Sequence, residues 1–243
     1  MDFKIIAIDG PTGVGKSTIA CELAEKLCCL YVDTGAMFRC LALCWGKNGC
    51  PESDDSLQEL GDQTRIVFKH KNVICNGKDV TDEIRTELIS SLASKISSFS
   101  SIREVMKKQQ RTLVEEVRKS ESYLGAVLEG RDIGTVVFPD AEFKFYFDAS
   151  PEERAKRRML QLQERGENAN FEKILTALRK RDFQDQNRKV APLKPAEDAL
   201  IVDTGNMSAD QVLEHLAACI GGEKNGRQSG VQFLKNQKIY LQR

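Results

Sequence analysis

The sequence predicts an α/β fold in which a five-stranded parallel sheet is wrapped by helices. Short apolar runs alternate with amphipathic helical patterns, and this alternation is typical of a parallel sheet that is covered on both faces. A glycine-rich segment directly follows the first apolar run, at the edge where such sheets bind ligands. The chain has 243 residues, which is enough for one sizeable core without a second domain. The expected strands are residues 4–9, 30–33, 125–129, 143–148 and 199–203.

The first strand leads into a loop with the residue spacing of a phosphate-binding P-loop. Gly10, Gly15, Lys16 and Ser17 fill the fixed positions of the pattern G-x-x-x-x-G-K-[ST]. Glycines leave backbone N–H groups free to converge on phosphate oxygens, and the helix that follows adds its positive dipole end. We expect Lys16 to reach the β- and γ-phosphates of a nucleotide and the Ser17 hydroxyl to ligate Mg²⁺. The expected nucleotide-binding residues are Gly10, Pro11, Thr12, Gly13, Val14, Gly15, Lys16, Ser17 and Thr18.

Residues 62–82 predict a small antiparallel insertion. RIVFKH and NVIC are typical of strands, and Asn76-Gly77 predicts a tight hairpin turn before KDV. Such an insertion is too small to fold alone. Two amphipathic helices are expected after it, and their apolar faces comprise Ile84, Leu88, Leu92 and Ile96 in the first and Ile102, Val105, Leu113 and Val117 in the second.

Arginines follow the second and third strands. Arg39 lies within DTGAMFR, and Arg131 and Asp132 begin the segment GRDIGTVVFPDA. One arginine in isolation would be an ordinary surface charge. Several arginines at one edge of a sheet indicate a second substrate that carries a phosphate.

The helix after the fourth strand begins with Ser150, Pro151 and Glu153, which form a capping pattern. Its basic face comprises Arg154, Arg157 and Arg158. These arginines predict either a solvated stripe paired with glutamates or a mobile helical lid, at residues 151–170, that meets the phosphoryl group in transfer.

The next helix is expected to begin near Phe171, with one face that starts apolar and ends charged. A solvated face would place its charges opposite the apolar stripe, so this face is expected to run from the core into a polar cavity. The face comprises Ile174, Leu178, Arg181, Asp185 and Arg188.

The C-terminal part is predicted to hold one more helix and a tail. A Ser-x-x-Gln capping box at Ser208 precedes the helix, which ends near Ile220. Residues 221–243 begin glycine-rich and polar, and they hold five basic residues against one acidic residue. This composition favours a flexible tail over an arm that binds nucleic acid.

The overall composition excludes several classes of protein. Lysine plus arginine and aspartate plus glutamate number 36 each, which argues against a protein that coats nucleic acid. The eight cysteines form no C-x-x-C pairs, so we expect reduced thiols in a cytoplasmic protein, with Cys21, Cys28, Cys40 and Cys44 on helices. No stretch has the length of a membrane span or the pattern of a signal peptide. We expect a monomer with small-molecule partners.

At these motifs the chain closely resembles bacterial cytidylate kinases. The matching segments are DGPTGVGKST, VDTGAMFR, GRDIGTVVFPDA, DASPEERAKRRMLQLQ and RDFQDQNR…APL. The resemblance runs from about Lys4 to Ile220, and it implies one kinase domain over residues 1–220 with the insertion on the acceptor side. It further implies that the γ-phosphoryl group of ATP is transferred, with Mg²⁺, to CMP and dCMP.

Matching motif to motif, the resemblance also implies roles for individual residues. Arg39, Arg131 and Arg188 would hold the acceptor phosphate. Ser94, Arg103 and Asp132 would recognise cytosine, whose amine donor and ring acceptors suit a carboxylate, a hydroxyl and a guanidinium. Arg181 and Asp185 would meet the ribose hydroxyls. Thr34 lies at a position where some members of the family carry serine, and it would still offer a hydroxyl. The residues expected at the transferred phosphoryl group are Lys16, Arg131, Arg154, Arg158 and Arg188, with Arg157 at the donor nucleotide. The loop ends Lys-Ser where several members have Lys-Gly, and the residues after 220 match nothing in the family.

Two other functions stay open from the residues alone. One is a different small P-loop kinase that acts on UMP, AMP or a metabolite. The presence of Asp132 together with Arg103 is the feature that would distinguish a cytidylate kinase from such an enzyme. The other is a GTP-dependent switch, which requires a guanine-binding N-K-x-D motif that the sequence lacks.

Overall fold

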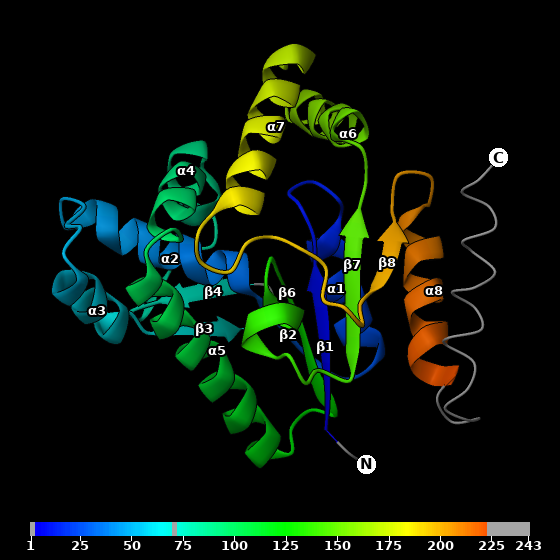
Figure 1. Cartoon of the computed structure of the whole chain (residues 1–243), viewed down its shortest axis with the longest axis horizontal. Helices are drawn as coiled ribbons and strands as arrows, with labels where there is room; N and C mark the ends of the chain where they lie inside the picture. Colours follow the sequence, from blue (N-terminus) through cyan, green and yellow to red (C-terminus); the bar gives the residue numbers. More distant parts are fainter. Residues whose placement is uncertain (1–2, 70–71, 223–243) are drawn as a thin grey trace.

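The structure is a computed structural model that describes residues 3–69 and 72–222. These residues contain a five-stranded parallel sheet with the strand order β2-β6-β1-β7-β8 (Figure 1). The predicted strands are confirmed to within one residue at each end. Their bounds are β1 (Lys4–Asp9), β2 (Leu30–Asp33), β6 (Gly125–Gly130), β7 (Phe143–Asp148) and β8 (Leu200–Asp203). Because β1 lies in the middle, the loop that follows it occupies the centre of the carboxyl edge.

Helices cover both faces of this sheet. Alternate residues of β1 enter different cores: Ile5 and Ala7 pack on one side, and Ile6 and Ile8 pack on the other. The Ile6 side is covered by α1 (Lys16–Lys26) and α8 (Ala209–Gly221). The Ile5 side is covered by α2 (Thr34–Lys47), α3 (Asp54–Gln63), α4 (Glu87–Ile96) and α5 (Ser100–Ser120).

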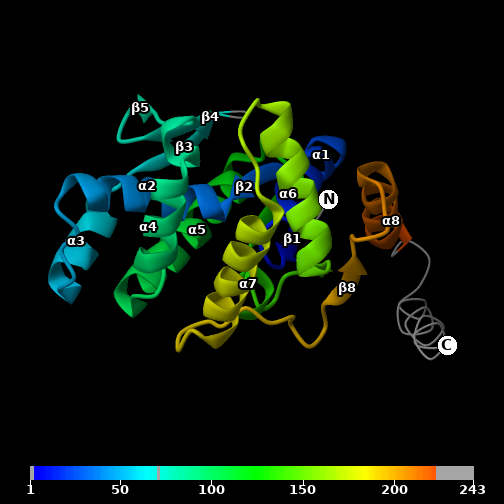
Figure 2. The same cartoon turned by 90° about the horizontal axis from the view of Figure 1, so that it is seen from above.

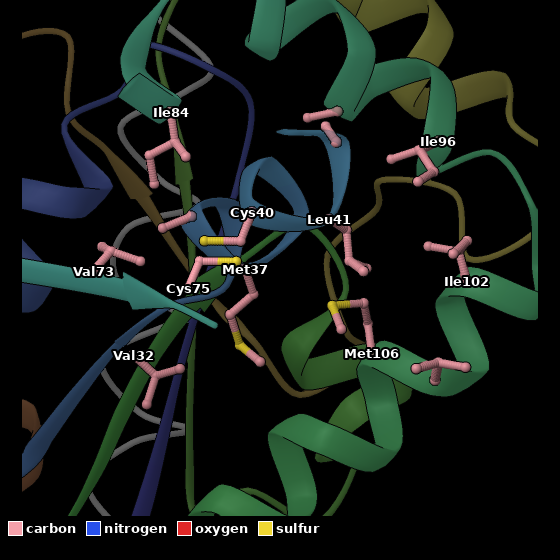
Figure 3. Close-up of a cluster of buried hydrophobic side chains, with 14 of the residues drawn as sticks. Val32, Met37, Cys40, Leu41, Val73, Cys75, Ile84, Ile96, Ile102 and Met106 are labelled. Carbon is pink, nitrogen blue, oxygen red and sulfur yellow. The ribbon is translucent and has the colours of Figure 1, made fainter. Parts of the chain in front are cut away.

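The predicted insertion is confirmed as a three-stranded antiparallel sheet, formed by β3 (Ile66–Lys69), β4 (Asn72–Cys75) and β5 (Lys78–Asp79). Asn76 and Gly77 have φ angles of 49° and 82°, the left-handed values that a tight two-residue hairpin turn requires. In the buried cluster of Figure 3, the side chain of Cys75 on β4 lies beside Cys40 of α2. The small sheet is thus anchored in the same core as the large one.

Two helices project beyond the carboxyl ends of the strands, α6 (Pro151–Glu164) and α7 (Phe171–Asn187) (Figures 1 and 2). The capping box predicted at Ser150 is present, with Glu153 as its partner. Ala155, Leu175 and Leu178 form a small core between the two helices, separate from the two cores of the sheet. This pair is therefore held to the rest of the molecule largely by polar contacts, which are described below.

Three local features differ from the expectations. The helix α3 was not predicted, because Leu57 and Leu60 give it only a short apolar pattern. Leu88 was expected to be buried but is 69% exposed, since Thr86 caps α4 and the buried face begins at Ile89. Cys28 was expected on a helix, but α1 ends before it and Cys28 lies exposed in a turn with φ of 51°. No helix in the described residues is long and apolar enough to cross a membrane.

Candidate active site

The P-loop lies at the centre of the carboxyl edge, between β1 and α1. Gly10 has a φ angle of 148°, and a Cβ atom there would lie 2.2 Å from the carbonyl oxygen of Phe147. Gly13 and Gly15 have φ angles of 85° and 89°, which other residues rarely adopt. Gly15 precedes α1 and no side chain caps the helix, so the N–H groups of its first turn are available to an anion. The glycine spacing therefore serves both the turn and the approach of phosphate.

Lys16 is buried within its own loop. Its ammonium donates a hydrogen bond of 2.7 Å to the carbonyl oxygen of Pro11. Burial, followed by the positive charge of Arg131, lowers the pKa of Lys16 below its usual value. A phosphate bound in the loop would supply the negative charge that opposes both effects.

A buried carboxylate fixes the loop that carries Arg131 and Asp132. Both oxygens of Asp9, the last residue of β1, accept backbone hydrogen bonds, from Ile133 at 2.9 Å and from Gly134 at 2.8 Å. Burial raises the pKa of Asp9 to about 6 in spite of these bonds. A role for Asp9 was not predicted from the sequence, because its partners lie more than 120 residues away along the chain.

A second buried carboxylate, Glu129, lies beside Ser17. Its side chain accepts a hydrogen bond of 2.8 Å from the Tyr31 hydroxyl and another from the Ser17 hydroxyl. Burial, followed by repulsion from Asp33, raises the pKa of Glu129. In the described residues no group of three or more histidine, cysteine or acidic side chains could hold a metal ion alone. A hydroxyl and a carboxylate at a P-loop do fit Mg²⁺, which keeps several waters and is held largely by substrate phosphates.

Arg103 and Asp132 form a buried ion pair at the acceptor side. The distance from Arg103 Nη2 to Asp132 Oδ2 is 2.6 Å, and the two residues are each 7% exposed. Arg103 also donates to the carbonyl oxygen of Ser97 at 3.1 Å, and the Ser97 hydroxyl in turn donates to the carbonyl oxygen of Ser94. The structure thus brings Arg103 and Asp132 into direct contact, whereas Ser94 is linked to Arg103 only through backbone carbonyl oxygens at the end of α4. Arg188 lies close to the Arg103–Asp132 pair, with Nη2 at 3.9 Å from Asp132 Oδ1.

Arg131 connects the acceptor side to the P-loop. Its Nε donates to Asp185 of α7 at 3.0 Å, and its Nη2 donates to the Thr12 hydroxyl at 2.6 Å. Burial alone would raise the pKa of Asp185, but Arg131 and Arg181 hold it below its usual value. The charged end of the α7 face therefore reaches the P-loop through Arg131, which contacts both Asp185 and Thr12.

The arginines of the acceptor side crowd one another. Burial, followed by the charge of Arg103, lowers the pKa of Arg188 to about 10. Burial, followed by the positive charge of Arg131, also lowers the pKa of Arg181. The charge of Arg39 lowers it further. Arg39 itself pairs with Asp33 at 3.0 Å. The buried guanidinium nitrogens of this group that lack a hydrogen-bond partner are Arg39 Nε, Arg103 Nε, Arg181 Nε and Arg188 Nη2.

The arginines of α6 do not form a solvated stripe. Arg154 is 2% exposed and binds both carboxylate oxygens of Asp182, at 3.1 and 2.6 Å. It also donates to the carbonyl oxygen of Thr12 at 3.1 Å. Arg157 donates to the carbonyl oxygens of Thr204 and Gly205 beside the P-loop, and Arg158 is half-buried. The polar contacts of Arg154 and Arg131 thus hold α6 and α7 against the P-loop.

Thr34, which was expected to offer a spare hydroxyl, donates it to the carbonyl oxygen of Glu129 at 2.6 Å. Its observed contact is therefore with the backbone of β6. The residues that sequence reasoning missed are Asp9, Tyr31, Glu129 and Asp182. Asp9 and Glu129 are acidic residues at the ends of apolar strands. That position was the one feature of the sequence from which a role for them could have been predicted.

Comparisons with known proteins agree with this geometry. A family model described as "Cytidylate kinase" matches residues 6–221. The chain is 44% identical to the cytidylate kinase of Geobacter sulfurreducens over 221 residues, which cover 89% of this chain and 92% of that one. It is also 44% identical to the cytidylate kinase of Yersinia pestis over 219 residues, which cover 88% and 92%. The crystal structure of TT1252 from Thermus thermophilus shares the fold, with a TM-score of 0.50 at 19% identity, covering 93% of this chain and 100% of that one.

Proposed function

The chain belongs to the cytidylate kinase family, and from this premise we propose that it transfers the γ-phosphoryl group of ATP to CMP, forming ADP and CDP. The observation that carries the proposal is a group of three buried guanidinium nitrogens without partners at the acceptor side, namely Arg39 Nε, Arg181 Nε and Arg188 Nη2. Buried N–H groups are normally hydrogen-bonded, so this group is completed by a ligand with several anionic oxygens. A nucleoside monophosphate beside a P-loop satisfies that requirement.

The donor nucleotide binds at the P-loop in this proposal. Backbone N–H groups and Lys16 hold its phosphates, and Arg157 lies at the same end through its contacts after β8. Mg²⁺, when bound, neutralises phosphate charge, and the Ser17 hydroxyl with the neighbouring Glu129 carboxylate are the oxygen groups that fit it.

The acceptor phosphate binds to Arg39, Arg131 and Arg188. Arg131 touches both halves of the site, because it contacts Thr12 of the P-loop and Asp185 of α7. Transfer spreads charge over the migrating phosphoryl oxygens, and positive groups fixed in advance stabilise that charge. We propose that Lys16, Arg131 and Arg188 lie at the migrating phosphoryl group and stabilise its charge. Arg154 and Arg158, from the proposed lid at residues 151–170, add to this stabilisation.

Cytosine binds to Ser94, Arg103 and Asp132 in this proposal. The Asp132 carboxylate accepts from the cytosine amine, whereas the oxygen that uracil carries at that position would be repelled. Arg181 and Asp185 face the ribose. We include dCMP among the acceptors, because CMP and dCMP share the base and the phosphate that most of these residues bind.

We further propose a monomer in a reducing cytoplasm. All assigned groups belong to one chain, and none of the eight cysteines, which all lie in the described residues, forms a disulfide. Analytical ultracentrifugation tests the first point, and cell fractionation tests the second.

A coupled assay of ADP release tests the function. CMP, dCMP, UMP and AMP are each offered with ATP, with and without Mg²⁺. We expect CMP and dCMP to give the highest kcat/KM, and little ADP release without an acceptor. Preference for UMP or AMP would overturn the acceptor assignment, and GTP hydrolysis without any acceptor would favour a switch protein.

A further inference from the structure

A small cavity lies behind the Arg103–Asp132 pair. Its volume is about 20 Å³, and its walls include Phe38, Met106 and Val137 together with the side chains of Arg103 and Asp132. A single water needs roughly 10–15 Å³ of such volume together with several polar partners. The cavity therefore has room for one water.

Two of the residues that line the cavity each carry a buried polar atom without a hydrogen-bond partner. These are Arg103 Nε and the amide oxygen of Gln110, a residue that is 2% exposed. Gln110 follows Arg103 by seven residues on α5, which places both side chains on one face of the helix. One water in this cavity would accept from Arg103 Nε and donate to Gln110 Oε1, and so would satisfy both atoms at once.

We propose that Gln110 is a positioning residue for base recognition, which acts through one ordered water on the guanidinium of Arg103. The inference rests on the proposed role of Arg103 and Asp132 at cytosine. Arg103 already donates to Asp132 at 2.6 Å and to the Ser97 carbonyl at 3.1 Å. The water adds the third contact, at Nε, and a guanidinium held at all three nitrogens cannot rotate away from the base plane.

The test is Gln110→Leu, with Gln109→Leu as the matched control on the same helix. Gln109 donates to the carbonyl oxygens of Gly61 and Thr64, away from the cavity. We expect Gln110→Leu to raise the KM for CMP about two- to tenfold, the effect of one hydrogen bond. The KM for ATP should stay unchanged and the CMP-over-UMP preference should fall. Gln109→Leu should lower thermal stability and leave both the CMP KM and the preference as they are.

Other outcomes separate this inference from the proposed function. If Gln110→Leu does not fold, Gln110→Met is used in its place, because methionine keeps the length of the glutamine side chain. A folded variant with an unchanged CMP KM and an unchanged CMP-over-UMP preference overturns the inference, as does a high-resolution crystal structure without a water between Arg103 Nε and Gln110 Oε1. If Asp132→Asn also leaves the preference unchanged, the base-recognition assignment fails as a whole. If Asp132→Asn alters the preference and Gln110→Leu does not, only the role of Gln110 fails.

Discussion

Asp132→Asn is the most informative perturbation of the acceptor site, because it removes one charge and keeps the shape of the side chain. The carboxylate lies 2.6 Å from Arg103 Nη2 and 3.9 Å from Arg188 Nη2, with 9% of its side chain exposed. In the proposed complex it also accepts the cytosine amine. The amide retains an oxygen acceptor but adds an N–H₂ group, which suits the oxygen of uracil and not the amine of cytosine.

The expected size of the effect follows from this burial. A hydrogen bond to a charged group contributes about 1.5–3 kcal/mol, which corresponds to a roughly ten- to 150-fold loss of kcat/KM for CMP. The CMP-over-UMP preference should shrink, and the KM for ATP should change little because the donor is bound at the P-loop. Breaking a buried ion pair also costs about 3–5 kcal/mol of stability, so a lowered Tm is expected as well.

The measurement is kcat/KM for CMP and UMP at a temperature where thermal melts show that the variant is folded. Glu52→Gln is the matched control, since Glu52 also forms an ion pair, with Lys95 at 2.7 Å, but both of these side chains are more than half exposed. An exposed pair contributes little, so this control should behave like the unmodified protein. Equal losses for CMP and UMP in Asp132→Asn would refute base recognition by Asp132 and leave it a purely structural partner of Arg103.

Three further predictions concern other parts of the chain. Lys16→Ala should abolish phosphoryl transfer while the circular dichroism spectrum stays native, and full activity in the folded variant would refute the P-loop assignment. The raised pKa of Asp9, about 6 against a usual 3.8, means that its contribution to the free energy of unfolding is present below about pH 4 and is lost as the pH rises through 6. Urea denaturation should therefore show an advantage over Asp9→Asn that is about 3 kcal/mol larger at pH 4 than at pH 7, and a constant difference would count against the buried carboxylate. Removal of residues 223–243, which lie outside the described residues, should leave CMP turnover nearly unchanged, because every assigned site residue precedes them; a large loss in the folded, truncated protein would assign the tail to the site.

The sequence predicted those features whose signal is local. The strands are buried on both faces and so appear as continuous apolar runs, and the P-loop is a contiguous motif. The charged end of α7 was visible because helical spacing alone aligns Arg181, Asp185 and Arg188 with the apolar face. The Leu88 error is also local in origin, since the cap at Thr86 shifts the start of α4 and moves the buried face to Ile89.

The supporting contacts could not be predicted, because they join residues that are distant along the chain. Asp9 meets its backbone partners 124 and 125 residues later, and Tyr31 meets Glu129 across 98 residues. Periodicity and motif spacing carry no information on such pairs. A polar residue that ends an apolar strand indicates only that some partner exists, since burial without one would be costly.

The charge balance of the acceptor side accounts for the arrangement of its ion pairs. The arginines of the proposed acceptor side outnumber the aspartates that pair with them; the set is Arg39, Arg103, Arg131, Arg181, Arg188, Asp33, Asp132 and Asp185. In the proposed function, a phosphate monoester, which carries close to two negative charges at neutral pH, would supply acceptors for the unpartnered nitrogens of Arg39 and Arg188. The aspartates do more than reduce the positive charge. In the structure each of them forms an ion pair that holds an arginine side chain in one rotamer. Since ordering flexible side chains on binding costs affinity, arginines that are already fixed by Asp33, Asp132 and Asp185 bind the acceptor more tightly than free ones would. The same carboxylates that neutralise part of the positive charge would therefore also prepare the site for the proposed anion.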